Sequence, residues 1–297
     1  MNNISPLAAI WLTVCINSFF PIFGWLAAGR ISPALYAFAG SAIGFACFLP
    51  WIARNGVFKT YFRPGLWPRL LAVGFFGSAL PIALLVTALR YTTPANAAIL
   101  CQVEAVYALV LAGIFLKEKV TPSQLAGTSL VLAGTMLIAL KERFTVRWTG
   151  DLMVLAVPLF YQISHLFSKK LPRELSHVFV ASARTLFASL GILPLVAFAA
   201  ARPGALFTPS LELLGILLVF GVALTALNNV LWYRAILNMD LSKATAIVLS
   251  YPVLTALLSH AFGIERLHVY QLAGLLLALA GAWWVTQLVK KDAPVPA

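Results

Sequence analysis

The sequence predicts an all-α membrane protein with ten transmembrane helices, arranged as two inverted five-helix repeats. Three observations lead to this fold class. The 297-residue chain is 61% hydrophobic and only 10% charged, apolar runs of membrane-spanning length recur along it, and one long segment occurs twice. Such a composition, with a mean hydropathy of +0.93, carries more apolar surface than a soluble domain of this length could bury. We therefore expect a multi-pass protein of a lipid bilayer.

Ten apolar runs are each long enough to cross about 30 Å of hydrocarbon at about 1.5 Å per residue. Pro94, Pro122 and Ser242 stand where first-turn or capping residues are expected. The first run lacks a basic segment before it, so we expect it to remain as a span and not to be cleaved as a signal peptide. The expected spans are Pro6–Ala28, Ala34–Ala53, Arg69–Arg90, Pro94–Leu116, Pro122–Leu140, Asp151–Ser168, His177–Ala200, Leu211–Ile236, Ser242–Phe262 and Val269–Leu288.

The repeat relates the two halves of the chain at a shift of 147 positions. Gln124–Gly134 matches Gln271–Gly281 at eight of eleven positions, and the same shift pairs Glu118 with Glu265 without a gap. The first two spans of each half align at a shift of 144. Apolar bias alone does not produce a matched Gln, a matched Glu and an uninterrupted register, so the halves are expected to be one unit used twice.

Residues 1–147 and 148–297 are therefore expected to be the two repeats. Because each holds five spans, an odd number, the second copy enters the membrane from the opposite side to the first. This is an inverted repeat, and in such folds sites lie near the bilayer midplane where the two halves face each other.

Charge sets the expected orientation. The formal net charge is +12. Of the 21 Lys and Arg residues, 13 fall in segments on the side of the membrane where the N-terminus is expected, seven fall on the opposite side, and Arg184 lies within a span. The Lys141–Arg147 linker runs against this bias. We expect both termini in the cytoplasm and anionic lipid headgroups, not nucleic acid, as the neighbours of these charges.

Several classes of function are disfavoured. No connecting segment exceeds about fifteen residues and no phosphate-binding Gly-x-x-x-x-Gly-Lys-Ser/Thr motif occurs, so this chain has no ATP-binding domain of its own. The four His residues are scattered and no His-Glu-x-x-His motif occurs, so we expect no enzyme and no cofactor. Cys15, Cys47 and Cys101 lie in different runs without metal-ligand spacing and are expected to be small buried hydrophobes.

Three ionisable residues fall inside the expected spans at compatible depths. Glu104 lies about 15 Å from the start of its span, near the midplane, where an ionised side chain costs about 3 kcal/mol. Arg184 and His165 each lie about 10 Å deep on other spans. Three such groups on three spans suggest one polar layer, and Glu104 is the candidate coupling residue.

Further polar residues fall close to this layer and complete the candidate substrate-binding set. The shifts pair Glu104 with Tyr251 and Ser18 with Gln162, as expected for a cavity lined by both halves. An alternative, which does not exclude the cavity, is a buried structural pair of Glu104 and Arg184 with a hydrogen-bonded His165. The candidates are Asn17, Gln102, Glu104, Gln162, His165, Arg184, Ser250 and Tyr251.

Arg184 is expected to bind the anionic end of a solute, because a guanidinium offers planar paired donors that match a carboxylate. Gly40 occupies the aligned position in the first half and is expected to supply space.

Other polar and small residues are expected to have structural roles. Glu118 and Glu265 would pair with neighbouring basic residues such as Lys117 or Lys119. Asn228, Trp232 and Tyr233 could shape a gate, but such residues are more often interhelical hydrogen bonds and an aromatic belt at the membrane interface. Pairs of small residues, with Gly127/Gly134 and Gly274/Gly281 each seven residues apart, would let helices approach closely.

On these residues the chain resembles the EamA-type branch of the drug/metabolite transporter superfamily. The resemblance rests on ten spans in two halves and on AAILCQVEAVYALVLAGIFLKEKVTPSQLAGTSLVLAG (97–134) and ATAIVLSYPVLTALLSHAFGIERLHVYQLAGLLLALAG (244–281). The family's Leu-Glu-Pro-like motif appears as Val103-Glu104-Ala105, and its Gly-Glu as Lys117-Glu118. An Arg common early in the second span is replaced by Gly40, and a Lys common late in the first span is missing, while Lys169 and Lys170 remain in the second half.

The resemblance implies a secondary transporter, with an exporter of amino acids or amino-acid-like metabolites as the main expectation. Protons are the candidate coupling ion, membrane lipids the surroundings, and a monomer or homodimer the expected assembly. One alternative is export of cationic drugs or of other metabolites such as metallophores or nucleosides. Another, of a different class, is a membrane scaffold or partner subunit that transports nothing.

Overall fold

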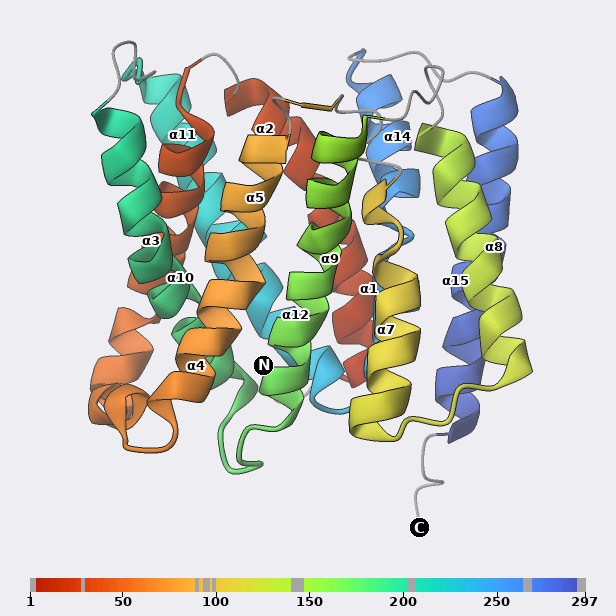
Figure 1. The fold of residues 1–297 in the computed structure, drawn as a ribbon, viewed down its shortest axis with the longest axis horizontal. Coiled ribbons are helices and arrows are strands. Elements are labelled where there is room, and N and C mark those ends of the chain that lie inside the picture. The colour runs from red at the N-terminus through yellow and green to blue at the C-terminus, as the bar shows by residue number, and fades with distance from the viewer. Residues whose placement is uncertain are drawn as a thin grey trace.

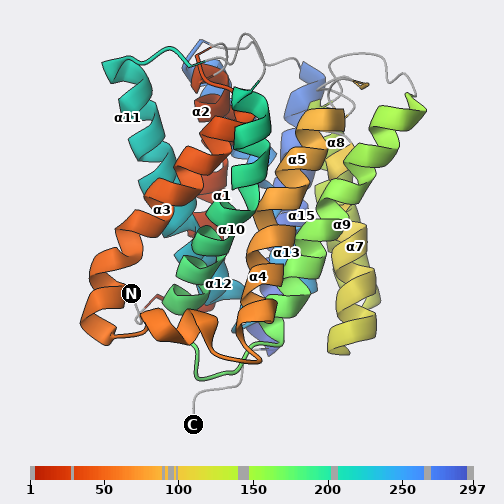
Figure 2. The same cartoon turned by 60° about the vertical axis from the view of Figure 1, so that its left-hand side comes forward.

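A computed structural model of the chain describes residues 4–27, 30–88, 91–92, 97, 100–139, 147–201, 207–263 and 269–292. Within these ranges the chain is helical, and the only β-type pairing is an isolated bridge between Ile31 and Phe207. The helices run roughly alongside one another in one bundle, and the loops gather at its two ends (Figures 1 and 2). α1 begins and α15 ends at the same end of the bundle, which we call the terminal side.

The helices of the first half are α1 (Pro6–Asn17), α2 (Phe20–Ala27), α3 (Pro33–Asn55), the 3-10 helix η1 (Phe58–Phe62), α4 (Trp67–Gly74), the π-helix η2 (Phe75–Ala79), α5 (Leu80–Ala88), α7 (Glu104–Leu111), the π-helix η3 (Ala112–Leu116) and α8 (Pro122–Ala139). Those of the second half are α9 (Trp148–Lys169), α10 (His177–Ala200), α11 (Leu211–Val219), the π-helix η4 (Phe220–Leu227), α12 (Asn228–Ile236), α13 (Leu241–Val248), α14 (Tyr251–Ala261) and α15 (Val269–Asp292).

Eight of these helical stretches are long and apolar enough to cross a membrane, and Glu104–Leu116 is a ninth, shorter apolar stretch. The all-helical, multi-pass character predicted from the sequence is thus confirmed for the described residues. The count of ten spans stays a prediction. The positions Ala28, Arg90, Pro94 and Leu140, most of the Lys141–Arg147 linker, and Glu265, Arg266 and His268 lie outside the described residues.

Local sequence explains where several helices begin. A serine hydroxyl accepts a hydrogen bond from the backbone N–H three residues later and so satisfies one of the free donors of the first turn. Pro122 begins α8 as expected. Ser242 lies in the first turn of α13, as the second residue of the helix that Leu241 begins, and is not its cap. The capping serines are Ser5, Ser32, Ser176 and Ser210.

The glycines of the repeated segment bring α8 and α15 into backbone contact. A Cβ on Gly281 would lie 2.6 Å from the carbonyl oxygen of Gly127 and from the amide nitrogen of Val131. A Cβ on Gly134 would collide with the carbonyl oxygen of Gly274. The close approach predicted from the small residues is present, and it pairs the last helix of one half with the last helix of the other.

Helices of the two halves also pack reciprocally. α1 packs on α12 and α5 packs on α9, while α3 packs on η4 and α10 packs on α4 and η2. Under the sequence shifts, each contact in these sets has a counterpart with the halves exchanged. A two-fold relation between the halves would produce this pattern.

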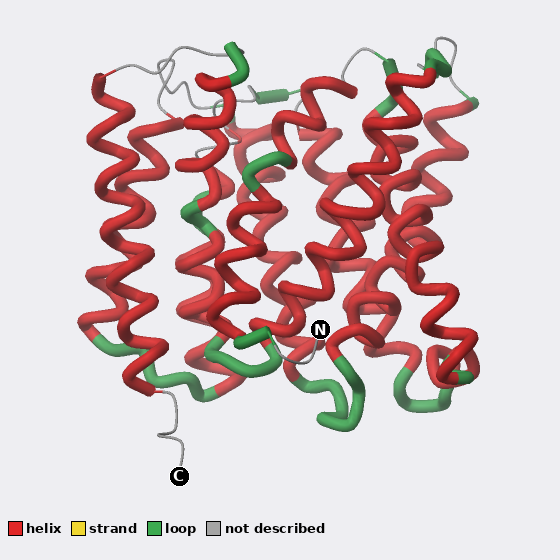
Figure 3. The backbone as a smooth tube through the Cα atoms, turned by 180° about the vertical axis from the view of Figure 1, so that it is seen from behind, coloured by secondary structure: helices red, strands yellow, loops and turns green. Residues whose placement is uncertain are grey.

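Two helical stretches are interrupted inside the bundle. α7 is preceded by a turn at Gln102 and Val103, and α14 by a turn at Leu249 and Ser250. Figure 3 shows short non-helical stretches within the bundle, apart from the loops at its ends. These interruptions place backbone ends of helices in the interior of a membrane protein.

The cysteines depart from the expectation of burial. Cys15 and Cys47 are exposed at the surface of the bundle, and Cys101 is half-buried. The outside of a membrane bundle faces acyl chains, so a small, weakly polar side chain costs little there. Apolar character in a span therefore does not distinguish the core from the lipid-facing surface.

Candidate functional site

The two interrupted helices restart at aligned positions. Glu104 is the first residue of α7 and Tyr251 is the first residue of α14, and these two residues are 147 positions apart. Both turns leave backbone groups free of intrahelical partners. The N-terminus of a helix also carries a partial positive charge, which favours an anionic group beside it. Discontinuous helices at corresponding positions of two halves are typical of the binding region of secondary transporters.

Glu104 and Gln162 form the first cluster of the site. The Gln162 Nε2 group donates to Glu104 Oε1 at 2.9 Å and lies 3.5 Å from the Thr245 hydroxyl. Gln162 is fully buried, and its Oε1 accepts no hydrogen bond among the described residues. α7, α9 and α13 thus meet at one amide that retains a free acceptor.

Arg184 forms a second cluster around the π-helix η2. Its Nη2 donates to the carbonyl oxygen of Gly77 at 2.6 Å, and its Nη1 lies 3.4 Å from the Tyr233 hydroxyl. The hydroxyl of Ser164 donates to the carbonyl oxygen of Val73 at 2.8 Å. Side chains of α9 and α10 therefore bond to one carbonyl just before the wide turn and to one within it. The buried Arg184 Nε has no partner in the described part of the chain.

His165 and Asn17 each form an interhelical hydrogen bond with α12. The indole N–H of Trp232 donates to His165 Nδ1 at 3.4 Å, which assigns the imidazole proton to Nε2 when the ring is neutral. The Asn228 Nδ2 group donates to Asn17 Oδ1 at 2.8 Å. Both residues therefore join helices together.

Gln102 and Ser250 each form a hydrogen bond with another group of the protein. Gln102 is buried and its Oε1 accepts from the Thr135 hydroxyl on α8 at 3.2 Å. Ser250 donates to the carbonyl oxygen of Ile247, three residues back, at 2.7 Å. Tyr251, in contrast, is only partly buried at the restart of its helix. The expected layer therefore contains polar groups with unused hydrogen-bonding capacity beside groups that bond to other protein groups.

Two further expectations need correction. Trp232 and Tyr233 are 6% and 0% exposed, so they form no aromatic belt; they contact His165 and Arg184 in the interior. The space expected at Gly40 is filled, because a Cβ there would collide with the ring of Phe220, which stacks on Tyr36.

Glu104 and Arg184 form no ion pair with each other. Their clusters are joined through α9, which carries both Gln162 and Ser164. The structure thus favours two adjoining polar clusters over the static carboxylate–guanidinium bridge that was the alternative.

Sequence reasoning missed three members of these clusters. Thr245 carries no signal, since threonine is common on apolar helices. Tyr233 was assigned to a gate or an aromatic belt and not to the Arg184 cluster, and Gly77 contributes only a backbone carbonyl. A Cβ at Gly77 would lie 2.6 Å from the Ser164 hydroxyl, so the glycine is required for this close approach.

Glu118 anchors the start of α13 and does not pair with Lys117 or Lys119 as expected. Its carboxylate accepts from the backbone N–H groups of Leu241 at 2.6 Å and Ser242 at 3.0 Å, and from the Ser242 hydroxyl at 2.6 Å. The Gln124 side chain also donates to the Ser242 hydroxyl, at 2.9 Å. A carboxylate at a helix N-terminus satisfies free donors and complements the helix dipole.

Lys117 stands where the family resemblance leads one to expect glycine. Its φ of 57° lies in the left-handed region, and it is the one non-glycine residue with positive φ in the described part of the chain. A side chain there costs about 1 kcal/mol relative to glycine. The turn that directs Glu118 toward α13 is thus strained by this lysine.

We expect Lys117→Gly to stabilise the fold by about 1 kcal/mol, because glycine adopts this φ without a Cβ penalty. Thermal unfolding of the purified protein measures the effect. Lys119→Gly removes the same charge at an exposed position without positive φ and should not stabilise. An equal change in both variants would trace the effect to charge and not to the backbone.

Comparison with known proteins gives one family and several relatives. The model of the EamA-like transporter family matches residues 4–140 and 148–287. An uncharacterized transporter of Archaeoglobus fulgidus is 24% identical over 285 residues, which cover 94% of this chain and 96% of that protein. The uncharacterized transporter YyaM of Bacillus subtilis is 20% identical over 246 residues, or 80% of this chain and 79% of that protein.

One solved crystal structure of a protein has a similar fold. It superposes with a TM-score of 0.77 at 19% identity and covers 97% of this chain and 98% of its own. At this identity the likeness concerns the fold alone.

Proposed function

The chain belongs to the EamA-like transporter family, and on that basis we propose that it is a secondary transporter that exports a small polar metabolite, an amino acid or an amino-acid-like compound. The observation that carries the proposal is the pair of interrupted helices whose restarts, at Glu104 and Tyr251, lie at aligned positions of the two halves. Transporters of this kind bind solutes where such helices break.

The free polar atoms support a binding role for this region. Gln162 Oε1 and Arg184 Nε are buried without partners among the described residues, and an unpaired buried polar group costs about 1–3 kcal/mol. A solute with both an acceptor and a donor, such as an α-amino acid, satisfies both groups. Its carboxylate would face Arg184 and its ammonium would face the free Oε1 of Gln162.

The proposed fold is two inverted five-helix units, residues 1–147 and 148–297, with ten spans and both termini in the cytoplasm of a bacterial inner membrane. The two ranges matched by the family model divide the chain near the same boundary. The reciprocal packing of α1 on α12 and α5 on α9 supports a two-fold relation. The excess of Lys and Arg on the terminal side supports the orientation.

The proposed mechanism is alternating access, with the terminal side closed in this conformation. Every residue of α13, from Leu241 to Val248, is buried, whereas most of α14 is half-buried or exposed. Glu118 and Lys169 both bind at the start of this buried helix, the latter by donating to the carbonyl oxygen of Met239 at 2.6 Å. Opening toward the terminal side would require these contacts to release.

Transport by the purified protein in vesicles tests the proposal. Labelled amino acids, nucleosides and organic cations are loaded in turn, and counterflow is measured with and without a pH gradient. Counterflow of amino acids supports the proposal. Movement of cations alone would overturn the solute class, and movement of none of the three classes would favour a membrane scaffold.

Arg184 is expected to determine affinity for carboxylate solutes. Arg184→Lys keeps the charge but loses the paired donors, so affinity should fall about tenfold, and Arg184→Ala should weaken binding by about 100-fold. Binding is measured by solute-dependent thermal shift. The control is Arg69→Lys, which makes the same change at an exposed residue at the start of the third span.

A purely structural role for Arg184 predicts a different result. Its bond to the Gly77 carbonyl would then matter most, and Arg184→Lys, which can still donate to that oxygen, would restore both folding and affinity. Normal affinity in a folded Arg184→Lys protein would contradict the assignment.

A further inference from the structure

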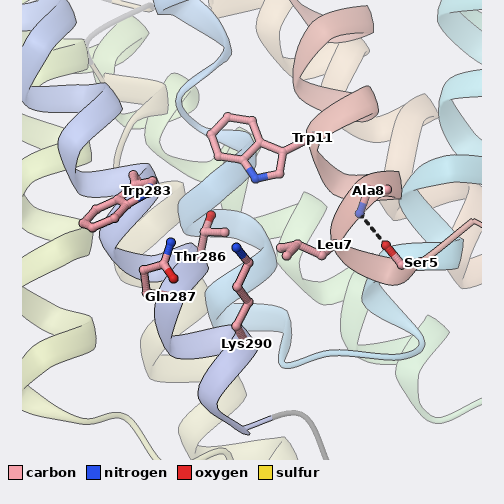
Figure 4. Close-up of a pocket in the computed structure, with 8 residues that line it drawn as sticks. All are labelled: Ser5, Leu7, Ala8, Trp11, Trp283, Thr286, Gln287 and Lys290. Atoms are coloured by element: carbon pink, nitrogen blue, oxygen red, sulfur yellow. Dashed lines mark hydrogen bonds between the residues drawn. The ribbon is translucent and has the colours of Figure 1, made fainter.

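A groove runs along the surface of the bundle between the two ends of the chain. It has a volume of about 420 Å³ and lies between the first turns of α1 and the last turns of α15 (Figure 4). α13 packs on both of these helices. The lining residues are Ser5, Leu7, Ala8, Trp11, Trp283, Thr286, Gln287 and Lys290.

The chemistry of the groove changes along its length. Lys290, at the end nearest the terminal side, is exposed, and Figure 4 shows its side chain extending along the groove between α15 and Leu7. Trp11 and Trp283 lie further in, and Trp283 is 64% exposed. Trp283 and Lys290 are seven residues apart, or about 10 Å along the helix. The groove thus combines the cationic side chain of Lys290 with an aromatic and aliphatic lining.

The two hydroxyl groups of the groove are engaged in hydrogen bonds within their own helices. The Ser5 hydroxyl accepts from the Ala8 N–H, and the Thr286 hydroxyl donates to the carbonyl oxygen of Ala282. Among the described side chains no carboxylate pairs with Lys290. Within the part of the chain that the structure describes, Lys290 therefore extends an ammonium without a carboxylate partner into the groove (Figure 4).

We propose that this groove binds one anionic glycerophospholipid of the leaflet on the terminal side. The headgroup phosphate contacts Lys290, and an acyl chain lies between Trp11 and Trp283. Lysine at the membrane surface attracts anionic headgroups, and tryptophan is favoured at the boundary between headgroups and acyl chains. The site is separate from the polar clusters of the bundle interior, and the proposal does not depend on the transported solute.

A second copy of the chain fits the groove less well. A symmetric dimer through this face would place the same residues of both copies against each other, and the two Lys290 ammonium groups would repel. A lipid with a negative headgroup complements the charge instead.

Native mass spectrometry of the purified protein tests the proposal. The protein is supplied with phosphatidylglycerol or phosphatidylcholine of identical acyl chains, and the retained lipid is counted. We expect preferential retention of phosphatidylglycerol, and a loss of that preference of about fivefold in Lys290→Gln. Lys59→Gln, the same change at an exposed residue of η1 outside the groove, should retain the preference. Trp283→Ala should reduce retention of both lipids alike.

Three results would overturn the assignment. The first is equal retention of the two lipids by the unaltered protein. The second is an equal loss of preference in Lys290→Gln and Lys59→Gln, which would indicate a diffuse effect of net charge. The third is a dimer that Trp283→Ala converts to monomer, which would assign the groove to a second copy of the chain.

Discussion

Glu104→Gln is expected to abolish transport driven by a pH gradient while leaving solute exchange without a gradient near normal. In the unaltered protein, Gln162 Nε2 donates to Glu104 Oε1 at 2.9 Å. A glutamine at position 104 keeps an oxygen that can accept this hydrogen bond, so the packing of α7 on α9 should be retained. It cannot bind or release a proton, and a coupling carboxylate must do both. Vesicles under an imposed pH gradient, compared with counterflow at equal pH, measure the two activities.

The matched control for Glu104 is Glu212→Gln. Glu212 forms an ion pair with Arg30, but its side chain is 63% exposed at the end of the bundle opposite the terminal side, so the same loss of charge should leave both activities unchanged. If Glu104→Gln lost counterflow to the same extent as gradient-driven transport, Glu104 would be a binding or structural residue and not the coupling group.

Gly281→Leu is expected to prevent accumulation of folded protein. The added Cβ would lie 2.6 Å from two backbone atoms of α8, on Gly127 and Val131, and backbone cannot move aside as a flexible side chain does. α8 and α15 must therefore separate, at a cost of about 3 kcal/mol or more. Size-exclusion chromatography of the extracted protein and its thermal unfolding measure the loss.

Gly215→Leu provides the control for this packing prediction. Gly215 lies on the apolar helix α11, and apart from its chain neighbours and the adjacent backbone of its own helix no described heavy atom lies within 4 Å of the position that a Cβ would occupy there, so leucine should be tolerated. Gly281→Ala should fall between the two. Folded Gly281→Leu protein with an unchanged melting temperature would show that the two helices can part without loss.

Much of the fold could be predicted because periodicity and repetition act along the chain. The small residues of Gln124–Gly134 predicted close packing, and the structure places them against Gln271–Gly281. The aligned positions of Glu104 and Tyr251 likewise predicted related surroundings, and both residues start a helix after a turn. Features that depend only on the spacing of residues along the sequence could therefore be predicted.

The direction of individual side chains could not be predicted in the same way. Gln102 points to Thr135 on α8, and Phe220 fills the space above Gly40. Helix rotation decides such contacts, and the π-helical turns change that rotation by adding a residue to the turn. A pattern that assumes a constant 3.6-residue period misplaces every side chain beyond the wide turn.

Glu118 illustrates a different limit. Its neighbours Lys117 and Lys119 suggested an ion pair, yet the carboxylate binds backbone N–H groups of α13, 123 residues later in the chain. Every residue other than proline has a backbone N–H group, so the sequence does not indicate which N–H groups a distant carboxylate will bind. A helix cap supplied by a distant residue therefore cannot be predicted from the sequence. The positive φ of Lys117 could not be predicted from this sequence either. The only indication of it is the glycine that the family pattern has at this position.

The wide turns η2 and η4 also bear on the history of the chain. Phe75–Ala79 corresponds, at the shift of 147, to residues 222–226, which lie within Phe220–Leu227. A π-helical turn arises when one residue is inserted into an α-helix without displacing its ends. Two independent insertions would have had to strike the same turn of two separate helices. A single insertion in an ancestral gene that encoded one half, followed by duplication and fusion, would account for both turns, and the irregularity would then be older than the two-half protein.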